Sequence, residues 1–271
     1  MALSLPDALT DEAQAPFIGV RTTNVFCRPG CPAPSPRAAN VEHFATARQA
    51  LFAGYRPCLR CTPLEDASPA PSDAEVRRGE RLRPILRRAR EARRLRTARH
   101  EVILRTLGTP LGPMLAGATA DGICLLEFND RPMLPTQLDV LQRRLRQPFA
   151  FGRHPLLDEL QRQLDEYFAG RRSTFDLPLV APGSPFQERT WAALRRIPAG
   201  STLSYEELAV EAGRPGAQRA AGMANGANRI AVLLPCHRVV RKGGELGGYG
   251  GGLWRKAWLL DHERRLAAAM G

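Results

Sequence analysis

The stretch Leu234-Pro235-Cys236-His237-Arg238-Val239-Val240 places one cysteine between a proline and a histidine, directly after the apolar run 230–234. This run predicts a buried strand that ends at Pro235, so that the sulfur of Cys236 would face a pocket wall. A free thiol is mostly protonated at neutral pH, and the imidazole of His237 is a neighbour that could take its proton. A lone cysteine beside aliphatic residues is more often a packed core residue, and both interpretations stay open at this point.

The composition of the chain restricts the classes of protein to consider. A length of 271 residues exceeds one average domain and suggests two or three. The formal net charge of +12 favours a polyanionic partner such as nucleic acid, although ordinary surface charge is an alternative. No apolar run reaches the length of a membrane span, and the first residues lack the features of a secretory signal. We therefore expect a cytoplasmic protein with no membrane partner.

Four of the six cysteines lie in the first quarter of the chain, as two close pairs. Cys27 and Cys31 have the spacing C-x3-C, and Cys58 and Cys61 have the spacing C-x2-C, with 26 residues between the pairs. Two such pairs can close a tetrahedral thiolate site around one Zn²⁺, and in an unsecreted chain this spacing indicates a metal rather than disulfides. The spacing predicts a small domain over residues 15–64 that a metal holds together in place of a large core.

An arginine-rich segment follows the cysteine pairs. Residues 65–72 contain two prolines and predict a linker, and residues 76–105 contain twelve arginines against three glutamates. Apolar residues are too sparse there for a substantial core. We expect residues 65–100 to form a linker and a solvated basic helix. An electrostatic clamp on a phosphate backbone is the functional alternative, and both can hold at once.

After residue 101 the apolar pattern becomes globular. The alternating, glycine-containing run 114–128 predicts strands of a small sheet, with Cys124 as a buried structural thiol. Apolar residues then recur every fourth position from Leu156 to Phe168, which predicts an amphipathic helix ended by Gly170. His154, before this helix, is expected to be a loop residue.

The last third of the chain has the pattern of short helices. Residues 184–229 predict helix, turn, helix, turn, helix, and Ser204 with Glu207 fits a capping box, so we expect a helix-turn-helix arrangement. A final helix is expected over residues 254–266. The predicted fold class is α+β and multidomain: a small zinc domain, a small α/β sheet domain and a helical helix-turn-helix domain.

Residues 107–265 resemble the O6-alkylguanine-DNA alkyltransferases, whose active-site run matches Pro-Cys-His-Arg-Val at 235–239. The resemblance implies a ribonuclease-like α/β domain over residues 101–181 and a helix-turn-helix catalytic domain over residues 182–267. It implies an irreversible, single-turnover transfer of the alkyl group from O6-methylguanine, and from O4-methylthymine, to Cys236. In the family the cysteine passes its proton through a water to the histidine, which a glutamate orients; these roles fall on His237 and Glu263.

The same resemblance assigns contacts with double-stranded alkylated DNA. Arg219 matches the arginine that fills the space left by a flipped nucleotide, and the small Ala220 and Gly222 would let this helix approach the minor groove. Tyr205 matches a tyrosine that contacts the target phosphate and base, and Asn228 matches a hinge asparagine before the active-site run. The other residues implied to contact the base are Val239, Tyr249 and Gly250, the last through its backbone N–H.

Two positions depart from the family's pattern. Arg229 follows the hinge asparagine where many members have proline, which predicts a less rigid turn. Gly250 stands where serine or alanine is common, and the glycines around Tyr249 predict a mobile pocket wall.

The runs 20–31 and 53–61 resemble the zinc domain of Ada-type methylation-response proteins. In that family the first cysteine is both a zinc ligand and the acceptor of a methyl group from DNA methylphosphotriesters, which would be Cys27 here. Only about 40 residues separate Cys61 from the globular pattern. They are too few for the AraC-like module of full-length Ada proteins, so we do not expect promoter activation.

These observations lead to three functional hypotheses. The leading hypothesis is a DNA repair protein that acts as a monomer and consumes itself in one turnover. The second is a DNA-binding regulator in which methylation of Cys27 alters DNA affinity. The third, a hydrolytic Cys–His enzyme, fails because nothing in the sequence resembles an oxyanion site.

Overall fold

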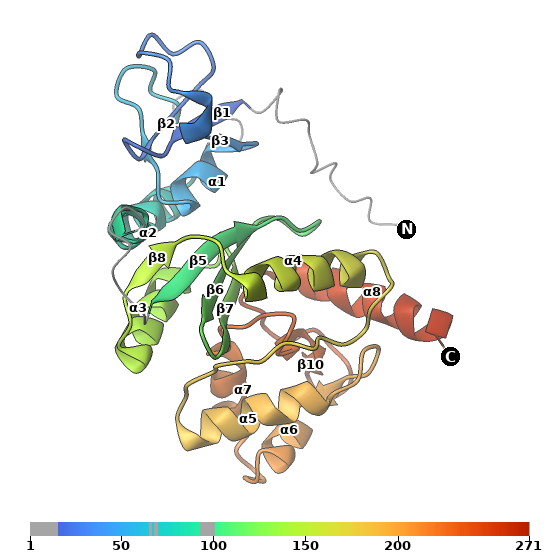
Figure 1. Ribbon diagram of the computed structural model, residues 1–271. Helices are drawn as coiled ribbons and strands as arrows, with labels where there is room; N and C mark the ends of the chain where they lie inside the picture. Colours follow the sequence, from blue (N-terminus) through green and yellow to red (C-terminus); the bar gives the residue numbers. More distant parts are fainter. Residues whose placement is uncertain (1–15, 65–66, 68–69, 93–100, 271) are drawn as a thin grey trace. The chain divides into compact units, whose positions relative to one another are not determined.

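The computed structural model describes residues 16–64, 67, 70–92 and 101–270, and the chain divides into two compact units (Figure 1). The first unit comprises Met1–Arg99 and Pro148–Phe151, and the second comprises His100–Gln147 and Gly152–Gly271. The division separates the four clustered cysteines from Cys236. The molecule therefore has two cysteine centres, one in each unit.

The first unit contains a four-stranded sheet of β1 (Phe17–Val20), β2 (Val25–Cys27), β3 (Val41–Phe44) and β4 (Arg56–Pro57) in the order β3-β1-β2-β4. Strand β1 is antiparallel to both β2 and β3, whereas β2 and β4 are parallel. The strand β2 ends on Cys27, and β4 ends immediately before Cys58, whose N–H donates to the carbonyl of Phe26 at 2.9 Å. Parallel pairing of two short strands thus brings the two cysteine pairs together.

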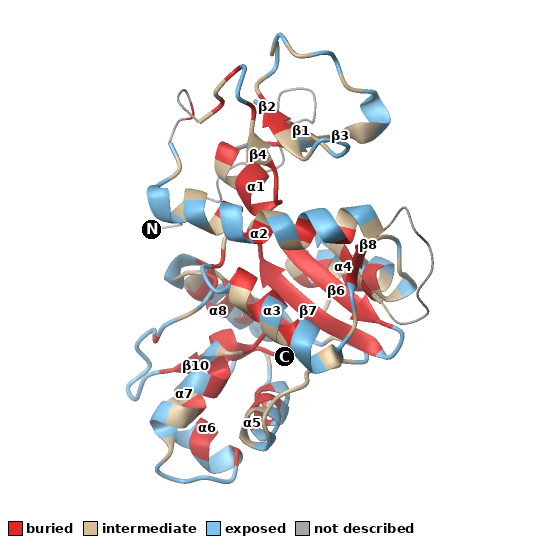
Figure 2. Ribbon diagram, turned by 90° about the vertical axis from the view of Figure 1, so that its left-hand side faces the viewer, coloured by how far each residue is buried: buried red, intermediate tan, exposed pale blue. Residues whose placement is uncertain are grey.

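Two helices pack in this unit, which also includes β8 (Phe149–Phe151). Helix α1 (Ala47–Phe52) begins with a capping box between Thr46 and Gln49, and α2 (Asp73–Ala92) continues through Pro84. Exposed and buried residues are interleaved along α2 (Figure 2), and its buried positions are Gly79, Leu82, Leu86 and Ala89. The expectation of apolar residues too sparse for a core is wrong over α2, because its buried stripe packs against α1. The rest of the basic segment, residues 93–100, lies outside the described residues.

The chain from residue 101 begins with a sheet whose first three strands are consecutively antiparallel. Strands β5 (Val102–Leu107), β6 (Met114–Thr119), β7 (Gly122–Phe128) and β8 (Phe149–Phe151) have the order β7-β6-β5-β8. The predicted strands over 114–128 are therefore confirmed, and Cys124 is buried as expected. Helices α3 (Leu134–Leu145) and α4 (Pro155–Phe168) follow, and α4 contacts β6 and β7.

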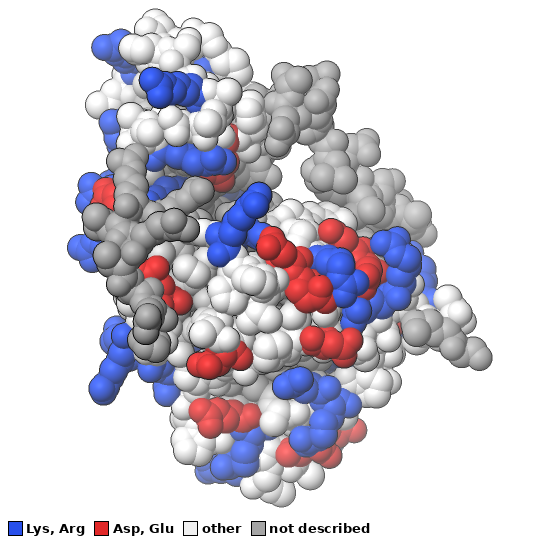
Figure 3. All heavy atoms as spheres, viewed as in Figure 1, with Lys and Arg blue, Asp and Glu red and all other residues white. Residues whose placement is uncertain are grey.

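Helix α4 ends before Gly170, as the sequence predicts, but its first turn differs from expectation. His154 is the N-cap of α4 rather than a plain loop residue, because its Nδ1 accepts a hydrogen bond from the N–H of Leu156 at 3.2 Å. On the face that carries α4, basic and acidic side chains are mixed (Figure 3), as in the contacts of Arg162 with Glu159 and Glu166. This face is not a continuous basic surface.

Three short helices and one long one form the rest of the second unit. Helices α5 (Pro185–Arg196), α6 (Tyr205–Glu211) and α7 (Gln218–Gly226) contact one another, in the predicted helix-turn-helix arrangement. The predicted capping box at Ser204 is present, and a second one at Ser184 begins α5. The parallel pair β9 (Leu203–Ser204) and β10 (Val239–Val240) and the helix α8 (Leu253–Met270) complete the unit.

The run 230–234 is buried but is not a strand, so this prediction is wrong. Only Ile230 bridges to Leu126 of β7; the chain then turns, with Val232 at a φ of 71°. The N–H of Ala231 still donates to the carbonyl of Leu126 on β7, but the N–H groups of Leu233 and Leu234 donate to carbonyls within the segment. Cys236 therefore begins a 3₁₀ helix, η3 (Cys236–Arg238).

One hydrophobic core extends through the second unit. It includes residues of β6, β7 and α4 together with residues of α5, α6 and α7, and Cys236 is part of it. Among the described residues, no helix is long and apolar enough to cross a membrane. The sheet and the three short helices thus position the Cys236 segment between them.

Candidate active site and metal centre

Cys236 is buried and its position is fixed by two asparagines. The side-chain amide of Asn228 donates to Cys236 Sγ at 3.1 Å and to the carbonyl of Leu234 at 2.8 Å, and its oxygen accepts from the N–H of Ile230 at 2.9 Å. Asn225 donates to the Cys236 carbonyl at 3.4 Å. Burial raises the pKa of the Cys236 thiol, and the N–H of Asn228 opposes this shift. A thiol in this setting needs a proton acceptor to become a nucleophile.

The imidazole of His237 is fully buried and contacts a carboxylate. Its Nε2 lies 2.9 Å from Glu263 Oε1, and because a carboxylate can only accept, Nε2 carries the proton. Burial lowers the pKa of His237, although Glu263 opposes the shift, so the ring is neutral at physiological pH. The other nitrogen, Nδ1, is buried and has no partner among the described residues. It is an unused acceptor next to the thiol in sequence.

Glu263 accepts hydrogen bonds from three different side chains. Besides His237, the guanidinium of Arg238 contacts both of its oxygens at 2.8 Å, and Tyr167 donates its hydroxyl at 2.7 Å. Burial alone would raise the pKa of Glu263, but His237 and Arg238 hold it well below its usual range. Neither Arg238 nor Tyr167 was among the site residues predicted from the sequence. Arg238 lies in the quoted stretch, whereas Tyr167 is 96 residues from Glu263 and gives no local signal.

A cavity of about 430 Å³ lies next to Asn225, which contacts the Cys236 backbone. Both predicted tyrosines line it: Tyr205 at the start of α6, with its hydroxyl 3.5 Å from the Gly248 carbonyl, and Tyr249. Burial raises the pKa of both phenols, so both are protonated. The remaining lining residues are Arg131, Pro132, Met133, Gly222, Gly226, Gly248 and Gly250. The structure thus brings together Tyr205, Gly222, Tyr249 and Gly250 of the predicted site.

The other predicted DNA-contacting residues lie outside this cavity. Arg219 is exposed on α7, and Ala220 is half-buried beside it. Val239 is fully buried on β10, where its carbonyl accepts from Lys256. Sequence analysis missed Met223, a large apolar side chain on α7 that is 77% exposed.

In the first unit, the four predicted metal ligands converge. The sulfurs of Cys27, Cys31, Cys58 and Cys61 lie within 4.8 Å of one another. The Cys31 and Cys58 sulfurs are 3.8 Å apart, which equals the separation of about 3.8 Å in a tetrahedral site with Zn–S bonds of about 2.3 Å. The N–H of Arg60 lies 3.4 Å from Cys58 Sγ, a contact of the kind that supports a thiolate ligand. The donor set and its geometry fit one zinc ion.

Comparisons with known proteins agree with both centres. Three family models match: the metal binding domain of Ada over residues 10–64, the ribonuclease-like domain of 6-O-methylguanine DNA methyltransferase over residues 102–181, and its DNA binding domain over residues 185–265. The chain is 34% identical to the regulatory protein ada of Salmonella typhimurium, over 90% of each chain. It belongs to the 6-O-methylguanine DNA methyltransferase family.

Two further relatives each match about three fifths of this chain. A methylated-DNA–protein-cysteine methyltransferase of Mycobacterium leprae is 41% identical over 59% of this chain and 91% of its own length. A second relative is the crystal structure of Mycobacterium tuberculosis OGT in complex with DNA, which is 38% identical in sequence. The match includes 61% of this chain and 94% of the OGT chain, with a TM-score of 0.53. The predicted fusion of an Ada-type zinc domain with an alkyltransferase is confirmed, and the four cysteines form one zinc site.

The first departure from the family's pattern, Arg229, is anchored. Its guanidinium lies over the ring of Trp191 and donates to the Pro182 carbonyl, and burial lowers its pKa to about 10. The backbone N–H of Leu126 also donates to the Arg229 carbonyl at 2.8 Å. The residue after the hinge asparagine is therefore held by side-chain contacts in place of a proline ring.

Lys256 is a second buried cation that sequence analysis missed. Its ammonium donates to the carbonyls of Val239 and, at 3.2 Å, Gly247, and burial lowers its pKa to about 8. It connects helix α8 to both β10 and the glycine-rich loop. A lysine in a helix of mixed composition carries no sequence signal of this role.

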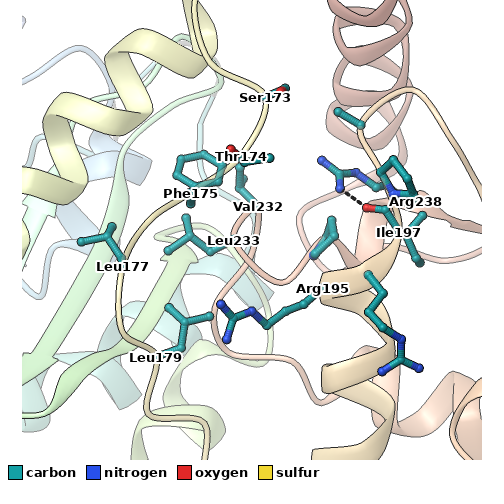
Figure 4. A pocket seen from close by; sticks show the side chains of 14 residues that line it. Ser173, Thr174, Phe175, Leu177, Leu179, Arg195, Ile197, Val232, Leu233 and Arg238 are labelled. Carbon is teal, nitrogen blue, oxygen red and sulfur yellow. Dashed lines mark hydrogen bonds between the residues drawn. The ribbon is translucent and has the colours of Figure 1, made fainter.

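A second cavity, of about 310 Å³, is lined in part by Val232, Leu233, Pro235 and Arg238 of the active-site segment. Figure 4 shows Phe175 near Val232 and Leu233, with Arg238 bonded to the carbonyl of Ile197. Cys236 is not among its lining residues. Cys236 does not line the first cavity either, but Asn225, which donates to the Cys236 carbonyl, does.

Proposed function

We propose that this chain repairs DNA by irreversible transfer of the alkyl group from O6-methylguanine, and from O4-methylthymine, to Cys236. The observation that carries the proposal is the buried series of contacts at this residue: Asn228 on the sulfur, and Glu263 on the neighbouring imidazole of His237. A core cysteine needs neither contact. Each protein molecule reacts once, because the thioether formed at Cys236 is stable.

The reaction is a displacement at the alkyl carbon. Sγ of Cys236 forms a bond to that carbon while the bond from carbon to guanine O6 breaks, and the electron pair of that bond stays on the guanine. The thiol proton passes through a water to Nδ1 of His237, which is free to accept because Glu263 holds the proton on Nε2. The carboxylate of Glu263 stabilises the imidazolium, and Arg238 and Tyr167 keep that carboxylate ionised and in place.

The burial of Cys236 decides how DNA must bind. Because the side chain is only 5% exposed, a base inside a duplex stack cannot reach the sulfur, and the target nucleotide has to leave the stack. Helix α7 would lie along the minor groove through Ala220 and Gly222, with Arg219 filling the gap in the stack. Met223 would add an apolar contact with the groove. One copy of the chain carries all of these residues, so a monomer suffices.

The zinc centre is proposed to accept a second type of methyl group, from methylphosphotriesters, at Cys27. Zinc keeps its cysteine ligands deprotonated, so a ligand thiolate can attack a methyl carbon without a separate base. Loss of one negative charge on methylation would favour the approach of this unit to phosphates. The alternative is a methylation-sensing regulator, in which this change of DNA affinity is the main function. It is favoured by the similarity to the regulatory protein ada over 90% of both chains.

Mapping of the transferred methyl group tests these assignments. Radiolabelled methylated duplex DNA is incubated with the wild type and with Cys236→Ala, Cys27→Ala and, as the control, Cys124→Ala, a core cysteine of neither centre. We expect labelled peptides at both Cys236 and Cys27 in the wild type and the control, and loss of one label in each site variant. Label at Cys236 alone would mean that Cys27 accepts no methyl group and that the first unit only binds DNA. A zinc-loaded wild type without label at Cys236 refutes the proposal and leaves the regulator.

A further inference from the structure

One wall of the cavity that contains Tyr205, Tyr249 and Asn225 comes from the sheet part of the second unit. Arg131 lies in the turn between β7 and α3, is 5% exposed and lines the cavity together with Tyr205 and Tyr249. Its guanidinium forms an ion pair with Glu127, itself fully buried on β7. None of the roles assigned to residues above accounts for a buried arginine in the wall of this cavity.

Contacts on several sides hold the guanidinium of Arg131 in place. Besides Glu127, it donates to the carbonyl of Asn228 at 3.0 Å and to the carbonyl of Gly226, the last residue of α7. Its Nε–H is buried and has no partner among the described residues. The group is therefore fixed in position, with one donor left unused.

Gly250 fits against this guanidinium. A Cβ atom at position 250 would lie 2.5 Å from both Cζ and Nε of Arg131, closer than van der Waals contact allows. The far end of a free arginine could move away, but here movement would break the contacts with Glu127 and with two carbonyls. Glycine at 250, where the family commonly has serine or alanine, is thus matched to an arginine 119 positions earlier in the chain.

We propose that Arg131, packed against Gly250, is a specificity-determining residue that limits the size of the alkyl group accepted for transfer to Cys236. The inference rests on the proposed function at Cys236. A rigid guanidinium in the wall leaves room for a methyl group and excludes a larger, planar adduct.

The test compares single-turnover transfer rates from duplexes that contain O6-methylguanine or O6-benzylguanine. Arg131→Met alone would leave Glu127 buried without its partner, so the main variant is the charge-neutral pair Glu127→Gln with Arg131→Met. Arg144→Met is the control, because Arg144 donates to the Gly183 carbonyl at the surface and does not line the cavity. We expect the benzyl-to-methyl rate ratio to rise at least tenfold in the pair and to stay unchanged in the control.

A purely structural role for Arg131 gives a different result. If Arg131 only holds the end of α7 through the carbonyls of Gly226 and Asn228, its loss would lower both transfer rates by the same factor. The benzyl-to-methyl rate ratio would then stay at the wild-type value, and that outcome overturns the proposal. If the wild type itself transfers no methyl group to Cys236, the proposed function fails instead. The two failures are therefore distinguishable.

The contact with Gly250 is tested separately by a double-mutant cycle. Gly250→Ala is expected to slow methyl transfer at least tenfold in the wild-type background. In the Glu127→Gln, Arg131→Met background the same change should cost less than threefold, because the atoms that clash are gone. Equal costs in both backgrounds would show that Arg131 does not occupy this space.

Discussion

The two cysteine centres differ in how their parts are distributed along the chain. The zinc ligands Cys27 to Cys61 come from one short segment, and two paired strands bring them together. The groups around Cys236 come from five elements or loops, and the contact between Tyr167 and Glu263 spans 96 residues. Zinc ligation requires four sulfurs at suitable distances. Activation of one thiol requires a complete fold around it.

This difference predicts that the two centres fail independently, and loss of zinc is the largest expected effect. In Cys58→Ser the first unit should lose its metal and its fold, because structural zinc sites contribute about 10–16 kcal/mol of apparent binding free energy. Methyl transfer to Cys236 should stay within about twofold of the wild type, since the ligands lie in the other unit.

Metal content and transfer to Cys236 are measured on the same full-length preparations. Cys124→Ser is the matched control, since it alters a buried cysteine outside both centres. A parallel loss of zinc and of transfer to Cys236 in Cys58→Ser would show that the two centres are coupled.

The second prediction concerns the buried carboxylate. Glu263→Gln keeps the shape of the side chain but removes the charge that stabilises the His237 imidazolium. We expect the single-turnover rate at Cys236 to fall about 10²–10⁴-fold, the range of positioned acid–base catalysis. Transfer at Cys27 should not change. Asp261→Asn, on the same helix and in an exposed pair with Arg265, is the control and should keep the wild-type rate.

The pH dependence of transfer at Cys236 tests whether His237 accepts the thiol proton. Burial lowers the pKa of His237, so its ring stays neutral to below its ordinary value of 6.5, and the rate should fall only under that pH. Burial raises the pKa of Cys236 above its ordinary value of 9.0, so little thiolate forms near neutrality. Rapid-quench rates should therefore be flat from about pH 7 to 8.5. A rise of about tenfold per pH unit in that range would instead indicate attack by a preformed thiolate without His237.

The same comparison shows what the sequence could predict. Local rules were sufficient for the zinc ligands, for α4, for the capping box at Ser204 and for the helix-turn-helix pattern. They failed for the run 230–234, because an apolar run reports burial and not backbone conformation. Here the hydrogen bonds of Asn228 favour a compact turn over a strand.

Buried polar and charged side chains were the other feature that the sequence could not predict. Arg131, Tyr167, Lys256 and Arg238 all support the Cys236 centre, yet an isolated arginine or lysine is usually a surface residue. Their partners lie on other elements, and only the folded chain identifies them. Resemblance to the family supplied Cys236, His237 and Glu263 but not the residues that hold them. The zinc centre needs no such support, which is why its spacing was informative by itself.

The smallest expected effect concerns the helix proposed to face DNA. Met223→Glu places a negative charge at an exposed position of α7, where it would oppose a nearby phosphate backbone. At DNA concentrations below saturation we expect transfer to Cys236 to slow about 5–10-fold, equivalent to about 1–1.4 kcal/mol. Val210→Glu adds the same charge to the neighbouring helix α6, where Val210 is also exposed, and should change the rate less than about twofold. Equal slowing in both variants would indicate an effect of net charge alone. Slowing of transfer at Cys27 by Met223→Glu would mean that both centres use this helix to reach DNA, and the two would then not be independent in binding.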